Sequence, residues 1–425
     1  MNIKQLFILL ALCSVQAISS KGQDKTTYKF DFGTGKAIPG FRKVAAADQY
    51  SGAKGYGFDF QTAINSEGRP FYFSVALPEG NYKVTVKLGA PRASLTTVKA
   101  ESRRLMLEDV RVAAGKSVIR TFIVNVKDKK INATEVVGLK PRELTKLDWD
   151  DKLSLEFDKS AALQTLEISK AEEQLTVFLA GNSTVVNQDD EPWGSWGQMI
   201  PVFFKPGVSI ANHAESGLTL GSFLGSRRLK KILSVMKPGD YLFIEFGHND
   251  QKEKGPEAGA YASYTERLKL FIRETRNKGG IPVIVTSTAR RSFQNGKMQH
   301  TLGDFPDAAR KVAAEEKVAL VDLNEMTTRL FNAMGEEESK KAFVHYPANS
   351  YPGQDKPLAD NTHFNTYGAY EIAKCVVEGI KSAKLGLVKY LAEPSKSFSP
   401  DQPDPVSDWH WPESLRSSVV KPDGN

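Results

Sequence analysis

Three short polar segments of the chain carry the side-chain types that acyl transfer through a hydroxyl nucleophile requires. The first contains Ser183, the second contains Asn249, and the third places Asp360 three residues before His363. A serine attacks a carbonyl when a histidine takes its proton, and a carboxylate holds that histidine in the required tautomer. A side-chain amide donates to the oxyanion that forms. Together the segments predict a serine-dependent acyl-transfer site.

Each segment taken alone also has an ordinary structural explanation. Ser183, just after Gly181, fits a helix cap, and Asp360 fits the cap of a helix expected from about residue 366. Gly217, a candidate backbone donor, fits a simple turn. The chemical interpretation therefore depends on whether the fold brings the segments together.

The first part of the chain, from about Tyr28 to Lys170, alternates polar and apolar residues in short runs broken by turn residues. Period-two alternation is typical of antiparallel sheet with one buried face. Many short strands without a long helix predict an all-β sandwich, which we place at residues 26–170. The runs expected to form strands are 28–32, 71–76, 82–88, 121–126, 153–157 and 165–168.

After Gln174 the apolar runs become continuous, as expected of strands that are buried on both faces. Helical patterns separate these runs, and this alternation predicts an α/β fold with a doubly wound parallel sheet over residues 174–390. The expected strands are 175–180, 208–211, 241–246, 282–286 and 318–322, and the expected helices are 229–236, 261–277, 306–317 and 367–384.

The candidate residues follow the predicted strands in order. Ser183 follows the first strand, Gly217 the second and Asn249 the third. Because ligands collect at the carboxyl ends of strands in such sheets, we expect these residues to meet at one edge. Arg290 and Arg291 follow the fourth strand and are candidates for binding substrate carboxylates, although an exposed basic loop is the more favoured explanation of this pair.

A metal site is a weaker interpretation of the same histidines. It would recruit His213, His248, Asp250 and His363, whose spacing matches no usual zinc pattern. We therefore expect neither metal nor other cofactor. Cys375 lies in an apolar helical stretch and is expected to be a buried thiol rather than a reactive one.

The N-terminal residues carry the pattern of a secretory signal peptide. Lys4 precedes an apolar run over residues 6–15 and a small-residue exit at Ala17, so residues 1–17 predict secretion or export to the periplasm. The run is too short to span a membrane. Lipid attachment at Cys13 is the less favoured alternative, because Leu12 stands where that cleavage signal requires a small residue.

Composition and the C-terminal region give weaker indications of function than the motifs do. The net charge of +7 is compatible with an acidic polysaccharide as partner. No basic run with interleaved aromatic residues is present, so binding to nucleic acid is not expected. Residues 391–425 form an extension rich in proline and serine. Trp409 and Trp411 favour packing of this extension on the body over the alternative, contact with substrate.

The polar segments resemble the four blocks of the SGNH (GDSL) hydrolase superfamily, which supply serine, glycine, asparagine and histidine in that order. The likeness within the superfamily is strongest to rhamnogalacturonan acetylesterases, and the β-rich part is similar to galactose-binding-like modules fused to carbohydrate esterases. The matching blocks are Gly181-Asn182-Ser183, Asn212-x-Ala214-x-x-Gly217, Glu245-Phe246-Gly247-His248-Asn249-Asp250 and Asp360-Asn361-Thr362-His363-Phe364-Asn365.

The resemblance implies a role for each matching residue. Ser183 would be the nucleophile, His363 the general base and Asp360 its orienting group. The oxyanion would be held by Asn249 with the backbone N–H groups of Ser183 and Gly217. Two positions depart from the pattern: Asn182 replaces the usual aspartate, and Leu218 follows the glycine where pectin-directed members often carry arginine.

The expected function is therefore a secreted serine carbohydrate esterase that removes O-acetyl groups from a pectic polysaccharide. Alternatives on the same fold are a general GDSL-type esterase or lipase and an acetylxylan esterase. A lipase should carry apolar loops, whereas residues 251–254 and 290–292 are polar. A non-catalytic carbohydrate-binding protein is the alternative from another class, and it would be expected to lack at least one catalytic residue, whereas none is missing.

Overall fold

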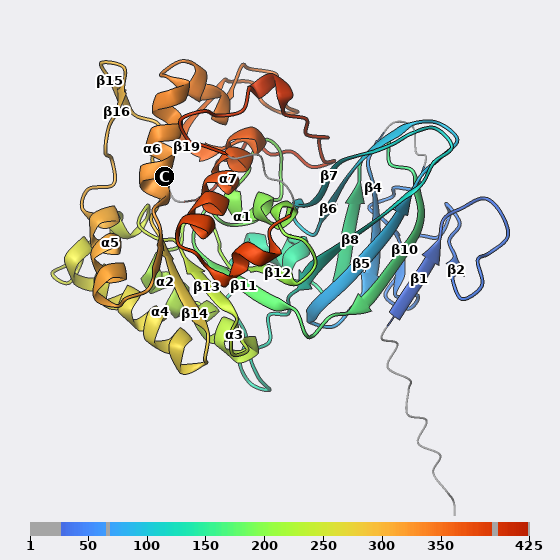
Figure 1. Ribbon diagram of the computed structural model, residues 1–425, viewed down its shortest axis with the longest axis horizontal. Helices are drawn as coiled ribbons and strands as arrows, with labels where there is room; N and C mark the ends of the chain where they lie inside the picture. The colour runs from blue at the N-terminus through green and yellow to red at the C-terminus, as the bar shows by residue number, and fades with distance from the viewer. Residues whose placement is uncertain (1–26, 65–68, 393–397, 424–425) are drawn as a thin grey trace, which may run out of the picture.

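The computed structural model describes residues 27–64, 69–392 and 398–423. The predicted signal peptide and Cys13 lie outside these ranges. Within them, no helix combines the length and the apolar character needed to cross a bilayer. Figure 1 shows two parts side by side, a β-rich part and a sheet with helices on both faces.

The β-rich part consists of two five-stranded sheets around one apolar core, which we call the β-sandwich. Alternate residues of the long strands, such as Val84 and Val86, point into this core, as the alternating pattern predicts. The first sheet has the order β2 (Arg42–Lys43), β1 (Thr27–Asp31), β10 (Leu163–Lys170), β5 (Gly80–Leu88) and β8 (Val118–Val126), and the second has the order β3 (Tyr56–Asp59), β4 (Phe71–Ala76), β9 (Lys152–Phe157), β6 (Ser94–Ala100) and β7 (Arg104–Val112).

All six strands expected in this region are present, but the sequence did not indicate β2, β3, β6 and β7. The pairing of β6 with β7 shifts register twice, so neither strand keeps a clean period-two pattern. Both strands also bury charged side chains, including Lys99 and Arg104. The alternating pattern therefore predicts fewer strands in the second sheet than the structure contains.

The second part contains a parallel sheet in the order β12-β11-β13-β14-β17, which confirms the predicted doubly wound fold. The chain starts at β11, places β12 on one side and then continues on the other side through β13. The carboxyl ends of β11, β12 and β13 therefore border the point where the winding direction reverses. The strand bounds are β11 (Leu175–Ala180), β12 (Val208–Asn212), β13 (Tyr241–Ile244), β14 (Ile281–Val285) and β17 (Ala319–Val321).

Helices cover both faces of this sheet, and each face has its own apolar core (Figure 1). The four expected helices are α3 (Arg228–Val235), α4 (Thr265–Asn277), α5 (Phe305–Glu315) and α7 (Thr366–Ser382). The sequence did not indicate α1 (Trp196–Met199), α2 (Leu220–Gly225) and α6 (Leu323–Met334). Two small hairpins complete the part, β15 (Phe293–Gln294) with β16 (Lys297–Met298) and β18 (Phe343–Tyr346) with β19 (Leu358–Phe364).

Ser183 does not cap a helix, so this ordinary explanation of its position is wrong. Residues 182–186 form one isolated turn, and the next helix, α1, begins only at Trp196. The Asn182 side chain accepts a hydrogen bond from the backbone N–H of Thr184 at 3.2 Å. This local side-chain pairing competes with helical hydrogen bonding.

Helix α7 sits very close to the segment that precedes β18. The Asn365 side chain caps α7 by accepting from the N–H of Gly368. A Cβ at Gly368 would lie 1.9 Å from the carbonyl oxygen of Ala342. Cys375 is buried in the same helix, as expected. Glycine is therefore required where α7 starts, immediately after His363.

We predict that Gly368→Ala destabilises the protein by about 1–3 kcal/mol, the usual cost of overpacking, because the Ala342 backbone must move. Gly225→Ala is the matched control, since a Cβ there meets no atom within 4 Å. Thermal unfolding of both variants measures the difference. Equal melting temperatures for the two variants would contradict this close approach.

Candidate active site

Ser183, His363 and Asp360 form one hydrogen-bonded chain. His363 Nε2 lies 3.0 Å from Ser183 Oγ, and His363 Nδ1 lies 2.8 Å from Asp360 Oδ2. An ionised carboxylate only accepts, so Nδ1 carries the proton and Nε2 is left to accept from the serine hydroxyl. All three side chains are buried. The arrangement is that of a serine nucleophile with its base and orienting carboxylate.

The environment of Asp360 favours its charged form. Burial opposes ionisation, but the hydrogen bonds from the His363 side chain and from two backbone N–H groups outweigh it and hold the pKa of Asp360 below its ordinary value. The other oxygen, Oδ1, accepts from the backbone N–H groups of Thr362 and His363, at 2.7 and 2.9 Å. Asp360 is therefore fixed in position and charge beside the imidazole.

A buried carboxyl group lies behind the Ser183 turn. Glu245, at the end of β13, accepts a 2.8 Å hydrogen bond from the Thr184 hydroxyl and another from the Trp196 indole N–H. Burial raises the pKa of Glu245 to about 7, although both hydrogen bonds act in the opposite direction. The group therefore joins the serine turn to α1 and the central strand. The apolar residues on either side of Glu245 in the sequence gave no indication of this role.

The glycine and asparagine segments also meet at this edge of the sheet. Asn249 Nδ2 donates to the carbonyl oxygen of Leu218 at 3.2 Å, so the amide lies beside the Gly217 loop. The amide has a second N–H. Asp250 ties the same two loops together by accepting from the N–H groups of Leu220 and Gly247. Gly217 has a φ of +78°, a conformation that favours glycine.

The peptide between Ser216 and Gly217 is held by two cations that sequence reasoning missed. The carbonyl oxygen of Ser216 accepts from Lys140 Nζ at 2.6 Å and from Arg142 Nη2 at 3.0 Å. These bonds fix the orientation of the peptide group that carries the Gly217 N–H. Lys140 and Arg142 lie at a short 3₁₀ segment in the loop between β8 and β9 of the β-sandwich, where no motif marks them.

The two arginines after β14 differ in their surroundings. The guanidinium of Arg291 bonds to Ser339 Oγ, to Asn361 Oδ1 and to a backbone carbonyl. Arg290 Nη2 donates to the carbonyl oxygen of His248, and its charge faces Asp360. Arg290 is therefore close to the triad, whereas the Arg291 guanidinium is engaged in joining loops.

The histidines of the metal interpretation do not gather. In the ranges that the structure describes, no group of three or more potential ligands is close enough to hold an ion. Burial lowers the pKa of His213 and of His248, so both rings are neutral. Asp250 is engaged with backbone N–H groups instead.

The C-terminal extension packs on the body, as the sequence predicts. The ring of Trp409 packs against Tyr370 of α7 in a tilted arrangement, with 4.4 Å between the ring centroids, and the Trp411 indole donates to Glu191. The chain then passes Trp193, whose indole N–H donates to the carbonyl oxygen of Ser418. Trp193 itself contacts the ring of His363 edge-on, at 5.8 Å.

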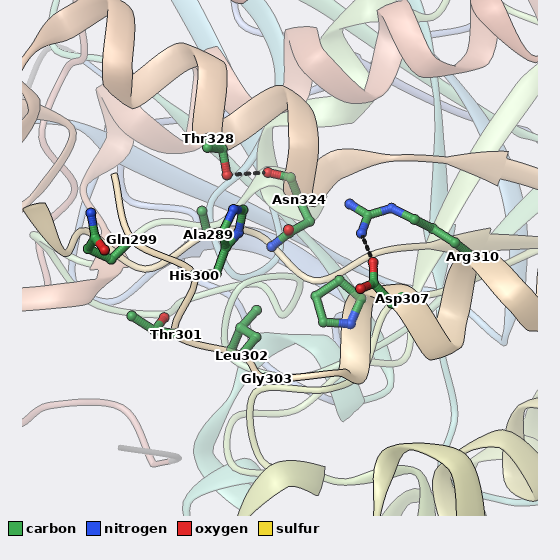
Figure 2. A pocket seen from close by; sticks show the side chains of 11 residues that line it. Ala289, Gln299, His300, Thr301, Leu302, Gly303, Asp307, Arg310, Asn324 and Thr328 are labelled. Carbon is green, nitrogen blue, oxygen red and sulfur yellow. Dashed lines mark hydrogen bonds and ion pairs between the residues drawn. The ribbon is translucent and has the colours of Figure 1, made fainter. Parts of the chain in front are cut away.

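A separate hollow of about 330 Å³ lies between α5, α6 and the loop over residues 299–303 (Figure 2). None of the triad residues lines it. Its polar groups are largely paired among themselves and with the backbone, as Figure 2 shows for Arg310 with Asp307. This hollow offers no activated nucleophile, so the chemistry belongs to the edge that carries Ser183.

We predict that Glu245→Gln makes stability less dependent on pH. The folded-state pKa of Glu245, about 7, exceeds the ordinary value of 4.5, so its stabilising contribution is complete below pH 4.5 and is lost as pH rises through 7. From pH 6 to pH 8, ionisation of this group should lower the free energy of unfolding of the unsubstituted protein by about 1 kcal/mol. Melting temperatures at both pH values, measured for the two proteins, test this. An equal decrease in melting temperature from pH 6 to pH 8 in the two proteins would contradict the prediction.

Comparisons with known proteins match families to both parts of the chain. The model of the GDSL-like lipase/acylhydrolase family matches residues 179–369, and the model described as "Beta-agarase/YXIM esterase-like, galactose-binding domain-like" matches residues 28–69. Rhamnogalacturonan acetylesterase RhgT of Bacillus subtilis (strain 168) is 43% identical over 220 residues, which cover 51% of this chain and 94% of that protein.

Two further comparisons extend over the β-sandwich. The uncharacterized esterase YxiM of Bacillus subtilis (strain 168) is 27% identical over 403 residues, or 88% of this chain and 96% of that protein. The crystal structure of the YxiM protein aligns with a TM-score of 0.48 and 26% identity, covering 85% of this chain and 99% of that one. From its motif blocks, its fold and its similarity to RhgT, this chain belongs to the GDSL-like lipase/acylhydrolase family.

Proposed function

We propose that this protein is a serine carbohydrate esterase that removes O-acetyl groups from an acidic, pectic polysaccharide. The observation that carries the proposal is the 3.0 Å hydrogen bond between His363 Nε2 and Ser183 Oγ at the switch point of the sheet. The similarity to a rhamnogalacturonan acetylesterase supports the choice of substrate class. Export through the predicted signal at residues 1–17 would bring the enzyme to such a substrate.

The geometry supports a two-stage reaction. Ser183 Oγ attacks the acetyl carbonyl carbon while His363 Nε2 takes the hydroxyl proton. The oxyanion of the tetrahedral intermediate faces the N–H groups of Ser183 and Gly217 and the amide of Asn249. When the carbon–oxygen bond to the sugar breaks, His363 returns the proton to the sugar oxygen, and the acetyl group stays on Ser183.

Water completes the cycle. His363 takes a proton from a water molecule, which attacks the acetyl-serine carbonyl through a second tetrahedral intermediate. The serine oxygen leaves with the proton from His363, and acetate is released. Asp360 stays ionised throughout and stabilises the imidazolium that forms in each stage, which fits the lowered pKa of its carboxyl group.

The surroundings of the triad favour a polar substrate over a lipid. A hollow of about 220 Å³ beside Trp193 is lined mainly by polar and charged residues, among them Arg142, Lys146, Asp189 and Asp190. Acyl chains of a lipid would leave these groups without water. This observation disfavours the lipase alternative.

The Leu218 departure has a structural explanation. Leu218 is buried in the apolar core beneath α2, α3 and α4. A side chain at this position packs inward in this protein, so it does not reach a substrate carboxylate. Recognition of an acidic sugar must then come from other residues.

We predict that Ser183→Ala reduces acetate release from acetylated rhamnogalacturonan by about 10³-fold or more, because the acyl acceptor is lost. Ser209→Ala is the control, since Ser209 is also buried, lies on the adjacent strand β12, and has a hydroxyl without a hydrogen-bond partner among the described residues. Acetylated xylan and a short aryl acetate are assayed in parallel. Retained activity in Ser183→Ala would refute the mechanism, and a strong preference for xylan would refute the pectic substrate.

We predict that Asn249→Ala lowers kcat on the aryl acetate by about 10²- to 10³-fold, the usual effect of losing one oxyanion donor. The small substrate limits effects on polysaccharide binding. Melting temperature is recorded alongside, because Asn249 also bonds to Leu218. A kcat within about threefold of the unsubstituted enzyme would exclude Asn249 from the oxyanion site.

A further inference from the structure

The segment over residues 417–423 crosses the candidate active site. The N–H of Ser418 donates to the carbonyl oxygen of Glu191, next to Trp193. Lys421 Nζ lies 3.4 Å from Asp360 Oδ2. Two residues later, Asp423 reaches the Gly217 loop, where a Cβ on Gly217 would lie 2.8 Å from Asp423 Cβ. The segment thus extends from the histidine side of the triad to the oxyanion side.

The carboxylate of Asp423 is held by two cations. Asp423 Oδ2 lies 3.1 Å from Lys140 Nζ and 3.0 Å from Arg142 Nη1. The same two side chains bond to the carbonyl oxygen of Ser216, which fixes them relative to the Gly217 peptide. A carboxylate-binding pair therefore lies directly beside a candidate oxyanion donor.

The local charge pattern makes Asp423 the exchangeable member of this cluster. Buried Glu215 pairs with Arg142 and with Lys146, and Lys146 also pairs with Asp189. Both anions are enclosed by the fold. Asp423 is 56% exposed, whereas Lys140 and Arg142 are 30% and 34% exposed, so all three are open to solvent. Ion pairs at such exposure are weak, so an incoming carboxylate can take the place of Asp423.

We propose that Lys140 and Arg142 form a subsite for a uronate carboxylate of the substrate, and that Asp423 occupies this subsite until substrate binds. The inference rests on the proposed function for its substrate class. It supplies the acidic-sugar recognition that Leu218 does not provide. When a uronate carboxylate displaces Asp423, residues 421–423 must move, and Lys421 then leaves Asp360.

Direct binding tests the subsite independently of catalysis. In a Ser183→Ala background, trigalacturonate without acetyl groups is titrated calorimetrically, with xylotriose as the neutral probe. Asp423→Asn should tighten trigalacturonate binding about two- to fivefold by removing the internal competitor, and Lys140→Met should weaken it by a similar factor. Binding of xylotriose should stay unchanged in both variants.

Matched controls exist for both changes. Asp401 is 56% exposed and pairs with Arg329 in the same extension, so Asp401→Asn removes an equivalent charge elsewhere. Lys29 is 40% exposed and pairs with Glu167 on the β-sandwich, so Lys29→Met controls for Lys140→Met. Both controls should bind trigalacturonate as the parent does.

Kinetics with active protein separate the two proposals. Asp423→Asn should lower KM for acetylated rhamnogalacturonan by a larger factor than KM for the aryl acetate. Lys140→Met should raise KM only for the acidic substrate. Because this variant also loses the hydrogen bond to the Ser216 carbonyl oxygen, its kcat should fall by the same factor on both substrates. Unchanged trigalacturonate binding in Asp423→Asn and Lys140→Met would overturn the subsite. The expected binding changes without acetate release from any acetylated polysaccharide would overturn the proposed function and leave the subsite standing.

Discussion

The hydrogen bond between Ser183 and His363 is the contact on which the rest of the candidate site depends. It joins residues 180 positions apart, at 3.0 Å, and neither residue is useful without the other. The serine is held by a turn braced against β13 through Glu245. The histidine is held by Asp360 and by the close packing of α7 against the Ala342 backbone. A small shift of either support would separate nucleophile from base.

The β-sandwich takes part in this positioning rather than lying apart from the site. Arg103, in the turn between β6 and β7, donates to the carbonyl oxygen of Trp193, the residue that contacts the His363 ring. The loop between β8 and β9 contributes Lys140 and Arg142, which hold the Gly217 peptide. Two loops of the site are therefore braced by residues that precede β11. This fits the comparison with YxiM, which extends over both parts of the chain.

Local patterns predicted the fold class and the residues that meet at the sheet edge. Continuous apolar runs mark the parallel strands, and the position of Ser183, Gly217 and Asn249 after successive strands predicts where they converge. Contacts that depend on distant chain segments had no such signal. Lys140 acts through a backbone carbonyl, and Asp423 reaches the site only because the extension folds back. Sequence spacing alone could not show either relationship.

The central claim is that His363 and Asp360 activate Ser183 alone as the nucleophile. Its most direct test is labelling with an aryl dialkyl phosphate, which transfers its phosphoryl group to an activated serine, followed by peptide mass mapping. The account predicts one label per protein, located on Ser183, with acetate release lost in proportion and no labelling in His363→Gln. Label on another residue, or full labelling of Ser183 in His363→Gln, would contradict it.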